Sequence, residues 1–396
     1  MPAQIGLGFS DHINPEQAAQ EASFQSKTNL GADRIDLAIV LTTIHYDPIL
    51  TIPVLQRVLN NAPLLGCSSA GIINSHAIKT RGISVLTLCS DDIKFGTGSV
   101  TNIDTLNPRE EGVALAIDCL NDFGKHPRQL SVFLIDGLIK NSFMLLKGIQ
   151  EVLGDVFPIV GAGTSDDFNF LESFQIFKEH KLAGSAVGLI LGGHMSIGIG
   201  ARHGWRPLGK PRIINKSEGN IILEIDHKPA IRLYEEYFQE KAYHLGASKL
   251  DTTSILYPLG IFIEGSDEYL LRNAINVLED GSIVCQGEVP QGAEVHIMIG
   301  NKSSCKQSAY DAALEAQKNL LGKVPNIIIV FESMSRLKLL GRMAYEEISE
   351  IREVFGPNIP IFGMYSNGEI CPMQTAQENF KKPHIQNGTI VVLAIG

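Results

Sequence analysis

One short pattern recurs along this chain, and it restricts the possible folds more than any other feature. An apolar stretch leads into a turn built from a proline, apolar residues and a glycine. The separations between the four marker glycines are 95, 99 and 103 residues. Such regularity predicts a repeated unit of roughly a hundred residues. The copies are PLLGCSSAG (63–71), PIVGAGTSD (158–166), YPLGIFIEG (257–265) and PIFGMYSNGE (360–369), with markers Gly66, Gly161, Gly260 and Gly363.

The third copy is one residue shorter and lacks the hydroxyl side chains of the others. Before each copy lies a β-branched apolar run of the kind that forms buried strands. Between run and marker the apolar spacing becomes helical. Each unit is therefore predicted to begin with strand, helix, strand. The four runs are residues 36–43, 130–137, 220–226 and 326–333.

After the first two copies the sequence predicts hairpins over residues 83–100 and 186–201, with residues 282–300 in the same place in the third unit. The last unit stops after one strand, residues 389–396. We therefore expect a mixed α+β (α/β) fold of repeated strand-helix-strand-hairpin units, in two related domains with mixed sheets. The segment from Trp205 to Glu218 is rich in proline, glycine and charge, and it is the expected domain boundary.

Composition narrows the class of protein. Lysine and arginine total 33 against 43 acidic residues, a net charge of −10, and no basic stripe is present, so a nucleic-acid partner is not expected. No apolar run approaches the roughly 18 residues of a membrane span, and the start does not resemble a secretory segment, which predicts a cytoplasmic protein. Six cysteines without a CxxC pair are expected to be free thiols. Glycine, at 38 residues, exceeds the usual share by about ten.

The marker turns are candidate ligand sites, because ligands of open α/β sheets bind beyond the carboxyl ends of the strands. Glycine lets the backbone approach a ligand, and short polar side chains add donors. Alternatively, each turn is simply a tight connection. If the units are related by pseudo-symmetry, the turns converge on shared pockets. The candidate turn residues are Cys67, Ser68, Ser69, Thr164, Ser165, Ser366 and Asn367.

Charged residues near the turns suggest a zwitterionic ligand. Asp166 and Asp167 follow the second turn, where a carboxylate caps a helix, binds an ammonium group or lies in solvent. Arg272 and Arg336 follow apolar runs, where a guanidinium binds a carboxylate or lies on a helix surface. Glu369 stands close to Tyr365. Together with the turn amides, these groups suit an amino acid.

Enzyme motifs are absent from the sequence. GCSSAG has Ala70 where a nucleophile elbow needs glycine, and no Walker loop, GxGxxG in a strand-helix context or HExxH occurs. Cys67 and Cys371 are possible nucleophiles or structural thiols, without an activating neighbour in sequence. No metal-ligand pair is present among the histidines. His203, beside the single tryptophan Trp205, is a candidate haem ligand or an ordinary core or surface histidine.

Seven of these segments, in order, resemble the motifs of the FIST family, in which a FIST N domain precedes a FIST C domain. The likeness spans nearly the whole chain and implies a FIST N domain over residues 1–207 and a FIST C domain over residues 208–396. The segments are GCSSAGII (66–73), GTSDDFNF (163–170), YPLGI (257–261), YLLRN (269–273), GEVPQGAEV (287–295), Arg336 and IFGMYSNGEICP (361–372).

The resemblance implies a sensory protein that binds a small ligand, such as an amino acid, and signals through a separate partner such as a histidine kinase. We expect a non-catalytic cytoplasmic sensor. The alternatives are a haem-binding nitric oxide sensor that regulates a histidine kinase, as some members are, and a cysteine-dependent enzyme. The family has His-Asn-x-Thr before its last strand. This chain has Gln386 in place of that histidine, and His384 two residues earlier.

Overall fold

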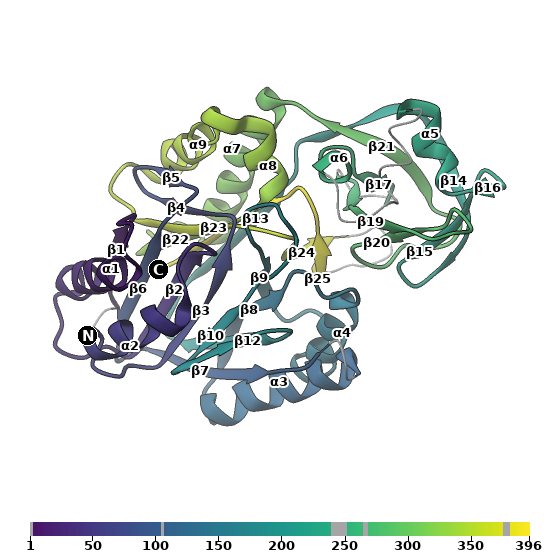
Figure 1. The fold of residues 1–396 in the computed structure, drawn as a ribbon. Coiled ribbons are helices and arrows are strands. Elements are labelled where there is room, and N and C mark those ends of the chain that lie inside the picture. The colour runs from purple at the N-terminus through teal and green to yellow at the C-terminus, as the bar shows by residue number, and fades with distance from the viewer. Residues whose placement is uncertain (1–2, 104–106, 239–251, 264–267, 375–380) are drawn as a thin grey trace.

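The computed structural model describes residues 3–103, 107–238, 252–263, 268–374 and 381–396. Residues 264–265, at the end of the third sequence copy, lie outside the described residues. Three six-stranded sheets form most of the molecule (Figure 1). In strand order, the first sheet contains β1 (Gln4–Ser10), β6 (Ile83–Cys89), β2 (Leu37–Thr43), β3 (Leu64–Ser69), β10 (Gln175–Phe177) and β11 (His180–Leu182).

The other two sheets have the equivalent order. The second contains β7 (Ile93–Val100), β12 (Ala186–Gly193), β8 (Arg128–Asp136), β9 (Ile159–Thr164), β24 (Glu369–Gln374) and β25 (Lys381–Gln386). The third contains β13 (Ile197–Arg202), β26 (Ile390–Ile395), β22 (Ile327–Ser333), β23 (Ile361–Ser366), β4 (Gly71–Asn74) and β5 (Ile78–Lys79). In each sheet the third and fourth strands are parallel, and the other pairings are antiparallel. This confirms the predicted mixed α+β fold with mixed sheets.

The three units exchange hairpins in a cycle. The hairpin β4–β5 follows the first marker turn but pairs with β23 of the third unit. The hairpin β10–β11 of the second unit pairs with β3 of the first, and β24–β25 of the third unit pairs with β9 of the second. Every sheet therefore ends with a hairpin contributed by another unit.

The apolar runs form strands that are buried on both faces. In β2, Leu37, Ile39 and Leu41 face a core shared by all three sheets, whereas Ala38 and Val40 face the helices outside. We call the core that the three sheets share the three-sheet core. Burial on both faces explains why the runs are continuously apolar rather than alternating.

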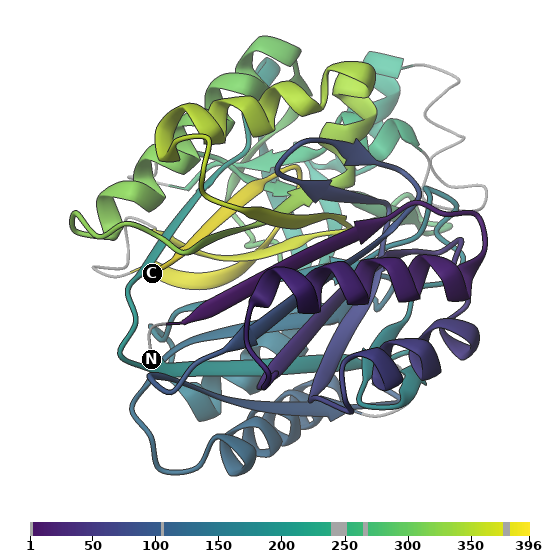
Figure 2. The same cartoon turned by 90° about the vertical axis from the view of Figure 1, so that its left-hand side faces the viewer.

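Helices cover the outer face of each sheet, and α1 crosses the first sheet in Figure 2. Side chains of Asn14, Asp47, Asn107 and Asn301 cap four of them. The helices are α1 (Pro15–Leu30), α2 (Pro48–Val58), α3 (Pro108–Phe123), α4 (Ser142–Leu153), α7 (Lys302–Asn319), α8 (Met334–Leu340) and α9 (Tyr345–Phe355), with a 3₁₀ turn at Gly341–Met343.

A further region is inserted in the third unit, between β13 and α7, and forms a fourth sheet (Figure 1). We call it the inserted sheet. Residues 205–218, the expected domain boundary, form its long strand β14 (Trp205–Glu218). The division into residues 1–207 and 208–396 stays a prediction. The remaining elements are β15 (Ile221–Ile225), β16 (Lys228–Pro229), α5 (Arg232–Phe238), α6 (Thr252–Leu256), β17 (Leu259–Ile261), β18 (Leu270–Arg272), β19 (Ala274–Val277), β20 (Ile283–Cys285) and β21 (Glu294–Gly300).

The predicted hairpins over residues 83–100 and 186–201 are wrong. The strands within each segment, β6 with β7 and β12 with β13, belong to different sheets. β6 pairs with β1 and β2, so both of its edges are already occupied. In the inserted region, likewise, β20 and β21 of residues 282–300 do not pair with each other. The actual hairpins, β4–β5 and β10–β11, come earlier, between the marker turns and these segments.

The marker glycines distinguish the true copies from the third one. Gly66, Gly161 and Gly363 each lie in the second strand of a parallel pair, and a Cβ there would lie 2.0–2.5 Å from a carbonyl oxygen of the neighbouring strand. Gly260 instead lies in β17, which pairs antiparallel with β18 and β21. The third sequence copy is therefore not a fourth unit of the repeat.

Candidate functional site

The three marker turns converge at the carboxyl ends of the parallel strand pairs. Ser165 Oγ and Ser69 Oγ both donate to the Tyr365 carbonyl, at 2.8 and 3.0 Å. The Asn367 N–H donates to the Gly163 carbonyl at 2.9 Å. Residues from all three units are thus in direct contact, as pseudo-symmetry predicts. The hydroxyl groups of Ser69 and Ser165 are hydrogen-bonded within the protein.

Other predicted turn residues also have protein partners. Ser68 Oγ accepts from the Phe174 N–H at 3.1 Å, and Thr164 Oγ1 donates to Ser173 Oγ at 2.8 Å. Asp166 is buried and accepts two backbone N–H groups of its own loop, those of residues 170 and 171. Asp167 is exposed. The two adjacent aspartates therefore differ in environment, one buried in its own loop and the other exposed.

The third unit carries a buried group of ionisable side chains at this end of its sheet. We call Glu332, Arg336, Glu347, Tyr365 and Glu369 the acid cluster. All five residues are fully buried. Ser366 Oγ donates to Glu369 Oε1 at 2.7 Å, which places a predicted turn hydroxyl directly against the cluster.

Arg336 is the single guanidinium of the acid cluster. It donates to the Glu347 carboxylate and to backbone carbonyls that include that of His203. It also donates to Ser308 Oγ at 2.9 Å, and its Nε lies 3.5 Å from Glu332 Oε1. One cation thus faces three carboxyl groups. If all three were ionised, the cluster would carry an uncompensated negative charge in a fully buried environment.

The carboxyl groups respond to this environment. Burial raises the pKa of Glu369 to about 8, against the hydrogen bond from Ser366. Burial and the facing Glu347 raise the pKa of Glu332 well above its usual value. The Glu332 carboxyl group lies against Glu347 and the Tyr365 hydroxyl, and Arg336 Nε is 3.5 Å from Glu332 Oε1. Fully buried acids that share a single cation are unusual and suggest a role in binding.

A short connection joins the acid cluster to the inserted sheet. The Thr389 N–H donates to Glu369 Oε2 at 3.1 Å, and Arg336 donates to the Gly388 carbonyl at 3.3 Å. On the other side, Asn387 Oδ1 accepts from the Asn273 N–H at 3.0 Å. Residues 385–389 are therefore held by the acid cluster at one end and by the inserted sheet at the other.

Arg272 belongs to this junction rather than to a carboxylate site. Its guanidinium donates to the carbonyls of Ile385, Leu271 and Glu288, at 2.9 to 3.0 Å. Burial lowers its pKa to about 10. Arg272 thus fixes one end of the connection 385–389.

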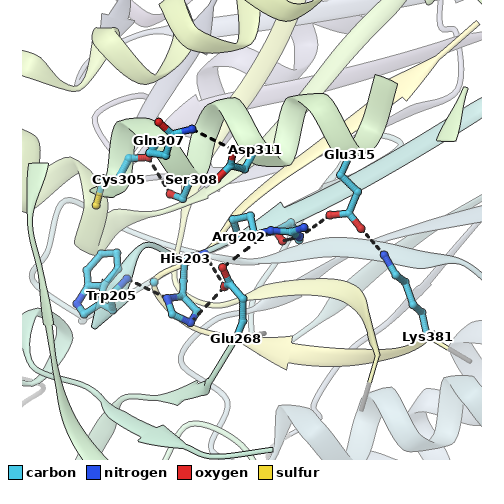
Figure 3. A network of polar contacts seen from close by, with 12 residues as sticks. Arg202, His203, Trp205, Glu268, Cys305, Gln307, Ser308, Asp311, Glu315 and Lys381 are labelled. Atoms are coloured by element: carbon cyan, nitrogen blue, oxygen red, sulfur yellow. Dashed lines mark hydrogen bonds and ion pairs between the residues drawn. The ribbon is translucent and has the colours of Figure 1, made fainter. Parts of the chain in front are cut away.

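His203 and Trp205 cover the acid cluster from the start of the inserted region. The Trp205 ring lies over Arg336, 6.0 Å from its guanidinium carbon. In Figure 3 the His203 ring is held between Trp205 and Glu268. Farther along this polar network, Glu315 pairs with Arg202 and Lys381.

His203 does not fit an axial haem ligand in this arrangement. Its Nδ1 accepts from the Trp205 N–H at 2.9 Å, and its Nε2 lies 3.2 Å from Glu268 Oε2. Burial, with the nearby charge of Arg336, lowers the pKa of His203 to about 3. The ring is therefore neutral, and its nitrogens already face protein partners. Among the described residues, no group of three or more His, Cys, Asp or Glu side chains has a metal-binding arrangement.

The two candidate cysteine nucleophiles are buried. The Cys67 thiol packs 3.6 Å from Met364 Sδ in the shared core. Burial raises the pKa of both Cys67 and Cys371 far above the usual thiol value. Neither residue is therefore a thiolate, which is the form that attacks a substrate.

Two members of the acid cluster were absent from the sequence-based candidates. Glu332 ends a strongly apolar strand, and a charged residue in that position was the available signal. Glu347 lies in the glutamate-rich helix α9 beside Glu346, and only the structure shows that Glu347 alone of this pair is fully buried.

We predict that the free energy of unfolding falls between pH 6.5 and 8, because two buried carboxyl groups, Glu369 in the acid cluster and Glu268 beside His203, have raised pKa values. The pKa of Glu369 is about 8 and that of Glu268 about 7, both raised by burial. A raised carboxyl pKa stabilises the folded state at low pH, and this contribution is lost as the pH rises through that pKa. His203, with its lowered pKa, acts in the opposite direction but only below about pH 6.5.

The expected loss is up to about 1.4 kcal/mol per pH unit for each proton released. Denaturant unfolding at pH 6.5, 7.25 and 8 measures it. Glu369→Gln should flatten the dependence, whereas Glu353→Gln, an exposed site on α9, should leave it unchanged. A free energy of unfolding that is constant or rises over this range contradicts the prediction.

Comparison with known proteins matches most of the chain. Residues 36–228 match the model of the FIST N domain, and residues 230–372 match that of the FIST C domain. An uncharacterised protein of Mycobacterium bovis is 23% identical over 381 residues, covering 93% of this chain and 94% of that protein. An uncharacterised protein of Methanocaldococcus jannaschii is 26% identical over 331 residues, covering 77% of this chain and 61% of that protein.

The structural comparison gives a distant likeness. The crystal structure of cyanuric acid hydrolase from A. caulinodans aligns over 99% of both chains with a TM-score of 0.40 and 8% identity. Within the described ranges, no helix combines the length and apolar character that crossing a membrane requires.

Proposed function

This chain belongs to the FIST family, whose domains are sensory domains of signal-transduction proteins, and from that premise we propose that it senses a small ligand carrying an ammonium group, such as an amino acid. The ligand binds at the acid cluster, and a separate signalling protein, such as a histidine kinase, receives the signal. The proposal includes no catalytic step, and it does not include haem, because the His203 nitrogens face Trp205 and Glu268.

The observation that carries this proposal is the shortage of positive charge at Glu332, whose cation Arg336 is shared with Glu347. Its carboxyl group is fully buried, it faces the carboxyl group of Glu347, and its distance to Arg336 Nε is 3.5 Å. Arg336 is already engaged by Glu347. An ammonium group supplies both the missing charge and three N–H donors, which a buried carboxylate pair prefers over a neutral ligand. Binding would convert Glu332 to its ionised form.

The connection 385–389 offers a route for the signal. Because Glu332 is fully buried, a ligand reaches it only when the cover formed by His203 and Trp205 moves. That cover begins the inserted sheet, which the Asn273–Asn387 hydrogen bond also ties to residues 385–389. Binding would therefore favour one position of the inserted sheet over another, a population shift that a partner protein can recognise.

The test compares three ligand forms by thermal unfolding. An amino acid and the amine that lacks its carboxylate should both raise Tm, whereas the acid that lacks the amino group should not. At a concentration of 100 times Kd the expected stabilisation is about 2.7 kcal/mol. The screen should cover the common amino acids at millimolar concentration.

Glu332→Gln is the decisive variant, since a glutamine replaces the neutral acid with nearly the same shape. It should retain the fold and lose the response to the amino acid, whereas the exposed-site control Glu353→Gln should keep it. Absence of any amine response in the unsubstituted protein, or a full response in Glu332→Gln, would reject the proposal.

A further inference from the structure

The three-sheet core contains a second space whose chemistry is opposite to that of the acid cluster. A cavity of about 50 Å³ lies among the inward-facing residues of all three sheets. Its wall is formed by alternate residues of the central strands: Leu37, Ile39 and Leu41 of β2, Val132 and Leu134 of β8, and Ile327, Ile329 and Phe331 of β22. We call it the interior cavity.

The interior cavity is separated from the marker turns by a layer of side chains. Along β3, Leu65 lines the cavity, Cys67 comes two residues later and Ser69 lies in the turn. Along β23 the same order is repeated, with Phe362 on the cavity wall and Met364 next. Since Cys67 and Met364 are in contact, they close the cavity towards the acid cluster. The two spaces are therefore independent of each other.

The wall of the interior cavity is apolar. Asn326 is the single polar residue among the described residues that line it, and the wall offers no polar surface. The backbone N–H of Asn326 is already donated to the Ile395 carbonyl at 2.7 Å. A water molecule inside would find no hydrogen-bond partner, and apolar cavities of this kind stay dry and take up apolar solutes.

We propose that the interior cavity is a binding site for small apolar molecules without hydrogen-bonding groups. Its size sets the upper limit, because a cavity of about 150 Å³ accommodates benzene or xenon. At about 50 Å³ the interior cavity takes a xenon atom or a molecule of very few heavy atoms, and it excludes an aromatic ring. Such a ligand gains contacts with aliphatic side chains from all three units at once.

Xenon is the probe for this proposal. Crystals pressurised with xenon should show one anomalous peak among β2, β8 and β22, and the ¹²⁹Xe resonance in solution should shift with saturable dependence on protein concentration. Val132→Phe places a larger ring in the cavity and should abolish both signals. Val324→Phe, the same change at an exposed residue outside the wall, should leave them unchanged.

An enlarged cavity provides a second measurement that does not depend on the folding of Val132→Phe. Leu134→Ala should at least double xenon occupancy at a given pressure and should admit benzene, which the unsubstituted protein rejects. Absence of a xenon peak in the unsubstituted protein overturns the proposal. So does failure of a folded Leu134→Ala variant to bind benzene. Neither result bears on the response to amines, because the two sites are separate.

Discussion

Alanine in place of Gly66, Gly161 or Gly363 is expected to prevent folding or to lower the free energy of unfolding by more than about 4 kcal/mol. The new Cβ would lie 2.0–2.5 Å from a carbonyl oxygen of the adjacent parallel strand. No rotation can relieve this overlap, because the backbone fixes the position of the Cβ and the atom it meets is a backbone carbonyl oxygen. The central strand pair of each sheet would have to separate. Soluble yield and denaturant unfolding of the three variants measure the effect.

Gly260→Ala is the matched control, since it changes the same sequence pattern in the inserted sheet. There the nearest atom to a Cβ is Met298 Sδ at 2.3 Å, the flexible part of a side chain. We expect a loss of about 1–3 kcal/mol, typical of overpacking. Equal losses of stability at all four positions would mean that close contact within the parallel strand pairs is not the reason for glycine at Gly66, Gly161 and Gly363.

The second large effect is expected for Arg336→Met, which should cost about 3–5 kcal/mol. The change leaves the buried Glu347 carboxylate without its guanidinium and frees the Ser308 hydroxyl and several backbone carbonyls, among them that of Gly388. A long apolar side chain retains much of the packing, so the loss reflects the charge and hydrogen bonds. Denaturant unfolding at pH 7 measures the change.

The double variant Arg336→Met/Glu347→Leu separates charge from packing. A buried ion pair exchanged for apolar residues of similar size is often neutral or stabilising. The double variant should therefore be more stable than Arg336→Met alone. If the two losses simply add, the two side chains do not interact energetically, and the buried pair is not what stabilises this region.

The sequence predicted those parts of the fold that depend on local backbone constraints. A glycine that must lie against a neighbouring parallel strand leaves a recurring pattern, and three copies were found on that basis. The third copy was misleading because its sequence is similar, but its glycine, Gly260, lies next to the Met298 side chain rather than against a parallel strand. The hairpins were misplaced because strand pairing across units has no local signal: β6 and β7 are separated by a short turn yet belong to different sheets.

The candidate site was predictable only in part. Arg336, Tyr365 and Glu369 were separate candidates from the sequence and lie together in the acid cluster, while their role in ligand binding stays a prediction. Arg272 was expected to bind a carboxylate, but it donates to three backbone carbonyls. Whether an arginine binds a ligand carboxylate or backbone carbonyls depends on which residues the fold places beside it. The spacing of residues along the chain does not indicate this. The partners of Arg336 come from α7, from α9 and from His203, which directly follows β13.

The cyclic exchange of hairpins has a consequence for synthesis on the ribosome. Residues 71–79 leave the ribosome early, but the strand that β4 joins begins only at Ile361. Until then the nascent chain exposes strand edges that other molecules can pair with. Contacts this distant in sequence close slowly. Synthesis of the third unit, rather than completion of the first, is therefore the step after which the hairpin β4–β5 can reach its native pairing.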